Sequence, residues 1–160
     1  MAEKQSRRAG RRGSATAPAL DDTDVAIVDT LEADGRATLS QLAELTGMSV
    51  SAVQSRVRRL EERGVITGYR AVVDGELRGL PLGAFVSVTP LDYSCEEQIP
   101  EILGRIEGVT ACYSVAGSES FVLRVRVASP SKLEELLNRI HRDVPVSTES
   151  LVILQTYFER

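Results

Sequence analysis

The sequence predicts an α+β protein of two small domains, an N-terminal winged helix-turn-helix unit and a C-terminal ferredoxin-like βαββαβ domain. Three observations indicate this fold class. The 160 residues leave room for two small domains. Apolar residues recur with the period of a helix as far as Gly64. Beyond Pro81, segments with the period of a strand alternate with segments that have the period of a helix.

The first helix is predicted over residues 20–35. Asp21 should cap its N-terminus, where Asp22 and Asp24 also suit the positive end of the helix dipole. Its packing face consists of apolar residues at helical spacing, namely Val25, Ile27, Val28 and Leu31. This helix should pack against the two helices that follow it and complete a three-helix unit.

The second helix should begin at Leu39, because Thr38 and Gln41 have the spacing of a capping box. Gly47 can adopt the left-handed conformation that closes a helix. The apolar side of this helix is formed by Leu39, Leu42, Ala43 and Leu45. A tight turn then leads to Ser49, the predicted N-cap of a third helix.

The third helix has one apolar row and one polar, basic face. The apolar row, which is expected to be buried, comprises Val50, Val53, Val57 and Leu60. On the opposite face, small hydroxyl side chains allow close approach to a major groove, Gln54 can pair with adenine, and arginines can reach phosphates or guanine. The residues predicted to contact DNA are Ser49, Ser51, Gln54, Ser55, Arg56, Arg58 and Arg59.

A helical hairpin with a solvated charged face is the alternative interpretation of these helices. The uneven charge favours DNA binding, because Glu61 and Glu62 are the only acids beside a run of four arginines. The four are Arg56, Arg58, Arg59 and Arg63. The formal net charge of -4 argues against a nucleic-acid partner, but the acids lie mainly outside this helix.

Residues 1–19 are small and basic and lack hydrophobic periodicity, so we expect a disordered basic arm. The arm either lies along DNA phosphates or a minor groove, or serves only as a solubilising tail. It lacks the apolar core of a secretory signal, and no apolar run approaches the roughly 20 residues of a membrane span. A cytoplasmic location is therefore expected.

No cofactor, metal site or catalytic centre is predicted. Cys95, Cys112 and His141 cannot form a zinc site, because the cysteines are far apart and no further soft ligands accompany them. Both cysteines are expected to pack as small hydrophobes, and His141 to complement a helix dipole. The sequence contains no glycine-rich phosphate loop and no recognisable nucleophile motif, so it indicates a protein that is not an enzyme.

The C-terminal domain is predicted from an alternation of strands and helices, reached through a strand or extended connector over residues 65–74. The elements expected after it are strand 82–89, helix 96–106, strands 109–115 and 121–127, a helix opened by Ser129 and Pro130, and a strand over about 147–158. Both helices should cover one face of an antiparallel sheet. The other face, with Arg124 and Arg126, then needs a partner, so we expect a dimer.

The stretch LDDTDVAIVDTLEADGRATLSQLAELTGMSVSAVQSRVRRLEERGVITGYRAVVD, followed by the βαββαβ order, resembles the Lrp/AsnC family of prokaryotic transcriptional regulators. The resemblance extends from residue 20 to about residue 158. It implies a DNA-binding domain over 20–66, a linker over 67–81 and a regulatory, oligomerising domain over 82–160. It also implies homodimers that assemble into higher oligomers, with pockets for small amino acids between regulatory domains of different dimers.

By this resemblance, an amino-acid effector binds at the loop between the two middle strands. Gly117 matches the family's Gly-x-x-Asp pattern, but Ser120 stands in place of the acid. Glu119 is therefore the expected partner of the ligand ammonium, with Ser120 as a neutral helper and Tyr113 beside the ligand side chain. The candidate ligand-binding residues are Tyr113, Gly117, Ser118, Glu119, Ser120, Thr148 and Ser150. A hairpin turn that simply carries a glycine is the alternative.

The leading functional interpretation is a sequence-specific DNA-binding transcriptional regulator that responds to a small amino acid. The alternative is a DNA-architectural protein that wraps the duplex without an effector, which the missing loop acid permits. An enzyme or metabolite-binding module is the weakest interpretation, because no residues for proton transfer, nucleophilic attack or metal binding can be assembled. The expected partners are double-stranded DNA, further copies of the chain and an amino acid, with no membrane.

Overall fold

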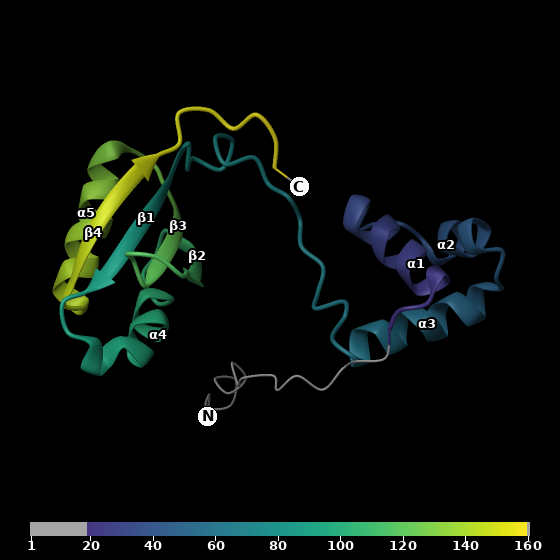
Figure 1. Cartoon of the computed structure of the whole chain (residues 1–160). Helices are drawn as coiled ribbons and strands as arrows, with labels where there is room; N and C mark the ends of the chain where they lie inside the picture. Colours follow the sequence, from purple (N-terminus) through teal and green to yellow (C-terminus); the bar gives the residue numbers. More distant parts are fainter. Residues whose placement is uncertain (1–18, 160) are drawn as a thin grey trace, which may run out of the picture. The chain divides into compact units, whose positions relative to one another are not determined.

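The computed structural model describes residues 19–159, apart from the side chain of Cys95. The chain forms two compact units that divide between Ala71 and Val72 (Figure 1). This division falls within the predicted linker, residues 67–81. The predicted basic arm, residues 1–19, lies outside the described residues except for Ala19.

In the described part of the first unit, residues 19–71, the chain forms three helices, α1 (Asp22–Ala33), α2 (Leu39–Thr46) and α3 (Val50–Glu62). Apolar side chains one turn apart face inward from each helix, because their burial removes apolar surface from water. The resulting small core consists of Ile27, Leu42, Ala43, Val53 and Leu60. The three helices predicted from the sequence are confirmed.

Hydrogen bonds at the caps explain where these helices begin. Asp21, Thr38 and Ser49 each accept a bond from a backbone N–H in the first turn of the following helix. The side chain of Gln41 accepts the N–H of Thr38 and completes the predicted capping box. Gly47 has a φ of 66°, the left-handed conformation that allows α2 to end and the chain to turn into α3.

Three apolar residues predicted to pack inward are exposed instead, and that expectation is wrong for Val25, Leu45 and Val50. They lie at the edges of their apolar rows, and three short helices bury too little surface to cover both edges. Beyond α3, residues 67–74 form no strand, so the extended connector is correct. It ends in a turn in which the Leu80 N–H donates to the Gly75 carbonyl.

The second unit contains a four-stranded antiparallel sheet (Figure 1). Its strands, in the spatial order β2-β3-β1-β4, are β1 (Leu82–Pro90), β2 (Val109–Ser114), β3 (Phe121–Val127) and β4 (Val146–Val152). Phe85 of β1 stands opposite Arg124 of β3 on one side and Leu151 of β4 on the other. The order and pairing confirm the predicted ferredoxin-like domain.

The first helical segment of this unit is shorter than the predicted helix 96–106. A 3-10 helix, η1 (Tyr93–Gln98), precedes α4 (Ile99–Leu103). The predicted length is wrong because Pro100 has no N–H to donate to the carbonyl of Glu96, so an α-helical ladder cannot continue through it. Glu96 instead accepts the N–H of Ile99, which is the bond of a 3-10 turn.

The core of the second unit lies between the sheet and its two helices, α4 and α5 (Pro130–Asp143). Ser129 caps α5 as predicted. Alternation along each strand sends every second side chain into this core and the others to the opposite side. We name that opposite side the open face; it carries Phe85, Tyr113, Arg124, Arg126 and Leu151.

The last strand ends at Val152, short of the predicted end at residue 158. Its neighbour β1 begins at Leu82, so beyond the bond from the Ile153 N–H to the Gly83 carbonyl only this one residue of β1 remains to pair with. Residues 153–159 then border the open face, where Glu159 pairs with Arg124 at 2.5 Å.

Candidate nucleic-acid interface and ligand site

The outward side of α3 presents most of the polar residues predicted to contact DNA. Ser51, Gln54, Ser55 and Arg58 are exposed, and their spacing brings them to one side of the helix. The hydroxyl oxygen of Ser49, the N-cap, lies 3.2 Å from that of Ser51. Small hydroxyls at the helix N-terminus and longer polar side chains farther along suit close approach to a major groove.

Arg58 forms an ion pair within α3. Its Nε donates to Glu62 Oε1 at 2.9 Å, and both side chains are mostly exposed. Exposed pairs of this i,i+4 kind contribute only about 0.3–0.5 kcal/mol to stability. Arg58 can therefore exchange Glu62 for a phosphate at little cost.

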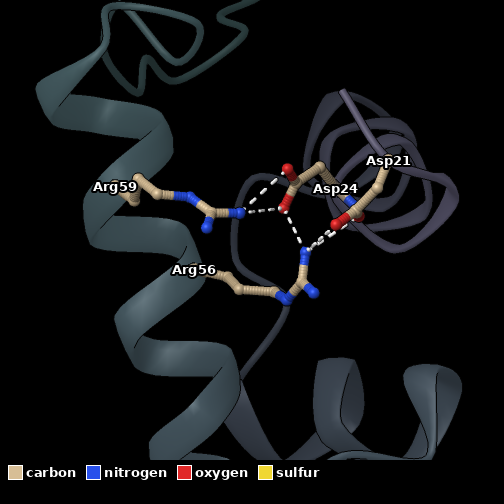
Figure 2. A network of polar contacts seen from close by, with 4 residues as sticks. All are labelled: Asp21, Asp24, Arg56 and Arg59. Carbon is tan, nitrogen blue, oxygen red and sulfur yellow. Dashed lines mark hydrogen bonds and ion pairs between the residues drawn. The ribbon is translucent and has the colours of Figure 1, made fainter. Parts of the chain in front are cut away.

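Two further arginines of α3 are held by carboxylates at the start of α1 (Figure 2). Arg56 Nη1 lies 2.6 Å from Asp21 Oδ2 and 2.8 Å from Asp24 Oδ1. Arg59 Nη2 lies 3.0 Å from Asp24 Oδ2. Asp24, at 2% exposure, is the one buried polar or charged residue in the part of the chain that the structure describes. We name these four residues the α1–α3 ion network.

Within the α1–α3 ion network, both members of the outer pair have shifted pKa values. The hydrogen bond from Arg56, and after it the bond from the Asp24 backbone N–H, lowers the pKa of Asp21 below its ordinary 3.8. The bonds to Asp21 and then to Asp24 raise the pKa of Arg56 above its ordinary value. The network joins two carboxylates to two guanidiniums, so opposite charges balance within it.

Glu61 and Glu62 are not the only acids beside the α3 arginines, and that expectation from the sequence is wrong. Asp21 and Asp24 lie 35 and 32 residues before Arg56 in the chain, so only the tertiary fold brings them together. The sequence did contain a sign of this pairing. Asp21 and Asp24 are three residues apart, as are Arg56 and Arg59, and this spacing places each pair on one side of its helix. The predicted role of the acids at the helix dipole does not account for this pairing.

The candidate ligand loop, residues 116–120, joins β2 to β3. Gly117 and Ser118 are exposed, whereas Glu119 and Ser120 are half-buried. The Ser120 N–H donates to the Val88 carbonyl at 3.2 Å and ties the loop to β1. Glu119 Oε2 lies 3.5 Å from the place where a Cβ atom at position 117 would stand, so the carboxylate folds back toward Gly117. The loop's one formal charge thus lies beside exposed backbone.

Thr148 and Ser150 are not gathered with this loop into one pocket within a single chain. They lie on β4, which β1 separates from β3. Two strand spacings amount to about 10 Å. Thr148 Oγ1 instead lies 2.9 Å from Nε2 of His141, which occupies the last turn of α5 as predicted. Both β4 residues therefore lie too far from the loop to form a direct hydrogen bond with it.

Tyr113 is on the open face, where it lines a hollow of about 450 Å³. Phe85 of β1, Arg124 of β3 and residues 155–159 also line this hollow. Because alternate residues of β2 face opposite sides of the sheet, the neighbouring Cys112 packs against the core. Burial raises the pKa of the Cys112 thiol, as expected for a cysteine packed as a small hydrophobe.

Within residues 19–159, no group of three or more histidine, cysteine, aspartate or glutamate side chains is placed to hold a metal ion. Over the same described residues, no helix has both the length and the apolar character required to cross a membrane.

Both units match models of known protein families. Residues 20–67 match a winged helix-turn-helix DNA-binding domain. Residues 83–160 match an Lrp/AsnC ligand binding domain. The two matches follow one another along the chain and correspond to its two structural units.

Individual relatives agree with these matches. The HTH-type transcriptional regulator LrpA of Mycobacterium tuberculosis is 57% identical over 140 residues, which cover 88% of this chain and 93% of the relative. A solved structure of a feast or famine regulatory protein from M. tuberculosis, complexed with L-methionine, is similar with a TM-score of 0.85 and 57% identity, over 88% of this chain and 96% of that one. AsnC of E. coli has a TM-score of 0.80 at 27% identity, over 89% and 97% of the two chains.

Proposed function

The chain belongs to the Lrp/AsnC family of transcriptional regulators, and we propose that α3 is its recognition helix and that an amino acid acts on its second unit. It is a DNA-binding regulator and not an enzyme. The observation that carries the proposal is the N-capped α3 with its exposed polar side. Access to chromosomal DNA would place the protein in the cytoplasm.

In this proposal the N-terminal end of α3 enters the major groove. Ser49, Ser51 and Ser55 are short enough for the backbone to approach base edges and phosphates. Gln54 can form a bidentate pair with an adenine, and Arg58 can reach a phosphate or a guanine. Arg56 and Arg59 are tied to α1, so we assign them to the scaffold of the unit rather than to its first contacts with DNA.

Arg58→Ala should weaken binding to every duplex and reduce the slope of log affinity against log salt by about 1. Gln54→Ala should instead relax discrimination at one base position. Fluorescence anisotropy measures both effects, with a duplex that the parent chain selects from a random pool and with a scrambled duplex. Arg105→Ala is a matched control, because Arg105 forms the same kind of exposed i,i+4 pair on the second unit. Unchanged affinity and slope in Arg58→Ala would exclude docking through α3.

For the effector, the loop 116–120 is the proposed site of an amino-acid zwitterion. Glu119 lies against Gly117, whose exposed backbone offers hydrogen-bonding groups close to a ligand. Glu119 would accept the ammonium group, with the Ser120 hydroxyl beside it. The L-methionine complex of the M. tuberculosis relative supports this ligand class. Since Thr148 and Ser150 are remote from the loop within one chain, a second subunit would have to complete the pocket.

Calorimetric titration with the common amino acids, L-methionine among them, tests this site. Glu119→Gln should lower affinity about tenfold to a hundredfold, because a charge-assisted hydrogen bond contributes roughly 1.5–3 kcal/mol. Glu134→Gln, an exposed position on α5, is the control. Equal binding by the parent and Glu119→Gln would remove Glu119 from the site. DNA binding by a parent chain that binds no amino acid would favour the architectural function.

The open face is the proposed interface between two copies of the chain. Phe85 and Leu151 are exposed there on neighbouring strands, and an unpartnered apolar face of a sheet favours association. A two-fold symmetric dimer would place its recognition helices on half-sites separated by whole helical turns of about 10 bp. Phe85→Lys should therefore sediment as a monomer, whereas Glu134→Lys, on the helical side, should behave like the parent. A dimer that survives Phe85→Lys would locate the interface elsewhere.

A further inference from the structure

The basic character of α3 is largely cancelled once the first unit folds. Arg58 pairs with Glu62, while Arg56 and Arg59 pair with acids of α1. Sequence-independent attraction to DNA arises almost entirely from cations that neutralise phosphates. The partners of these arginines therefore bear directly on how strongly α3 attracts DNA of any sequence.

Asp24 is the centre of the α1–α3 ion network. Its carboxylate accepts hydrogen bonds from Arg56 at 2.8 Å and from Arg59 at 3.0 and 3.1 Å, and the residue is buried. A buried carboxylate that lost these donors would remain in surroundings of low dielectric without compensation. A DNA phosphate therefore competes with Asp24 for these two guanidiniums at a disadvantage.

Arg59 lies at the side of the proposed recognition face, one turn beyond Ser55, and its side chain is half exposed. Figure 2 shows both Arg56 and Arg59 reaching from α3 toward the start of α1. Arg59 bonds Asp24 through Nη2 alone. Without Asp24, its long side chain would be free to turn to a phosphate beside the face.

We propose that Asp24 is a specificity-determining residue, which holds Arg56 and Arg59 on α1 and thereby suppresses attraction to phosphates at sites of the wrong sequence. Discrimination is then left to Ser51 and Gln54. Because specificity is a ratio of affinities, lowering the sequence-independent term raises it. The inference rests on the proposed docking of α3 in the major groove.

Asp24→Asn tests the inference, because it removes the buried charge with little change in size. The full-length variant should bind a scrambled duplex about threefold more tightly at low salt, with a salt slope steeper by about 1, since one more arginine neutralises a phosphate. Its affinity for the duplex selected by the parent should rise less, so the ratio of the two affinities falls. Circular dichroism during thermal unfolding shows whether the variant folds.

Asp22→Asn is the matched control, since Asp22 carries the same charge in the same helical turn but is exposed and outside the network. It should leave the affinity ratio and the salt slope close to those of the parent. An equal change in both variants would assign the effect to net charge alone and overturn the role of Asp24.

Arg59→Gln keeps the inference testable should Asp24→Asn not fold, because glutamine retains a donor for Asp24. Arg59 makes no phosphate contact under the proposal, so this variant should keep the parent's salt slope and its affinity for the scrambled duplex. A slope reduced by about 1 would overturn the proposal, as would an unchanged slope and ratio in folded Asp24→Asn. Failure of α3 docking itself is distinguishable, since Arg58→Ala would then also leave binding unchanged.

Discussion

The two units of this chain are stabilised in different ways. Among residues 19–159, the second unit buries fifteen apolar residues between its sheet and helices. The described part of the first unit buries five, and adds the buried charge of Asp24 with the arginines that compensate it. A small core contributes less apolar stabilisation, so the charged contacts between α1 and α3 carry a larger share in the first unit.

The two kinds of stabilisation should respond differently to salt and pH, and this bears on DNA binding. An apolar core responds little to salt or pH, whereas an ion network responds to both. In the proposed docking, the unit that binds DNA, a polyanion, uses arginines both for its packing and for attraction to its partner. Its stability and its DNA affinity should therefore be coupled, while the second unit should be free of that coupling.

The largest expected effect comes from the apolar core of the second unit. Leu123→Ala, at a fully buried position of β3, should lower the free energy of unfolding of this unit by about 2–5 kcal/mol through lost burial and a residual cavity. Hydrogen exchange during denaturant titration measures the loss in each unit. The amides of α1, α2 and α3 should keep their protection.

Leu154→Ala is the control for this prediction, because Leu154 is 95% exposed and its truncation should change stability by less than about 0.5 kcal/mol. Equal loss of protection in both units of Leu123→Ala would contradict the comparison and show that they unfold together.

A smaller effect is expected at the turn of the first unit. An added Cβ at Gly47 meets no atom within 4 Å, but the φ of 66° is strained for a residue with a side chain. Gly47→Ala should therefore cost about 1–2 kcal/mol, and Gly47→Asn less, since asparagine tolerates the left-handed conformation. Thermal unfolding followed at the amides of α1, α2 and α3 measures the loss of stability in both variants. Gly35→Ala, whose Cβ would make an ordinary contact at 3.7 Å, should be tolerated; a comparable loss there would refute the conformational explanation.

The smallest effect concerns pH. The pKa of Asp21 is lower in the folded unit than its ordinary 3.8, so the unfolded chain binds the proton more readily. The stabilisation from Asp21 is therefore complete well above pH 3.8 and is lost as the pH falls through the lower, folded pKa. Unfolding curves recorded from neutral to acid pH should show this loss in the first unit.

Asp21→Asn should remove that part of the acid sensitivity while keeping the N-cap, because asparagine caps helices about as well as aspartate. A variant whose first unit loses stability in acid as steeply as the parent would show that other carboxylates account for the effect.

Local chemistry made much of the fold predictable. The caps at Asp21, Thr38 and Ser49 satisfy backbone groups within one turn, and the strand Phe121–Val127 shows its alternation directly. The predictions from the sequence are wrong where contacts between distant parts of the chain determine the structure. The end of β4 depends on where β1 begins, and the exposure of Val25 depends on how far neighbouring helices reach.

The candidate sites likewise have features that local spacing predicts and features that depend on distant parts of the chain. The polar side of α3 follows from helical spacing alone, so Gln54 and Arg58 could be placed on it from the sequence. The partners of Arg56 and Arg59 could not be identified by counting nearby charges, because Asp24 lies on another helix. For the proposed ligand loop, the structure of one chain presents Glu119 beside Gly117, while completion of the proposed pocket would depend on how copies assemble.

The connector sets how far apart the two DNA half-sites of the proposed dimer can lie. Residues 67–74 form neither helix nor strand, and eight residues span at most about 26–29 Å when fully extended. Once one recognition helix occupies its half-site, the second becomes a tethered ligand, with an effective concentration that short linkers bring to the millimolar range. Half-sites beyond the reach of the tether would lose this gain entirely. In the proposed dimer, the length of the connector, as much as the contacts of α3, would therefore limit which spacings of half-sites can be bound tightly.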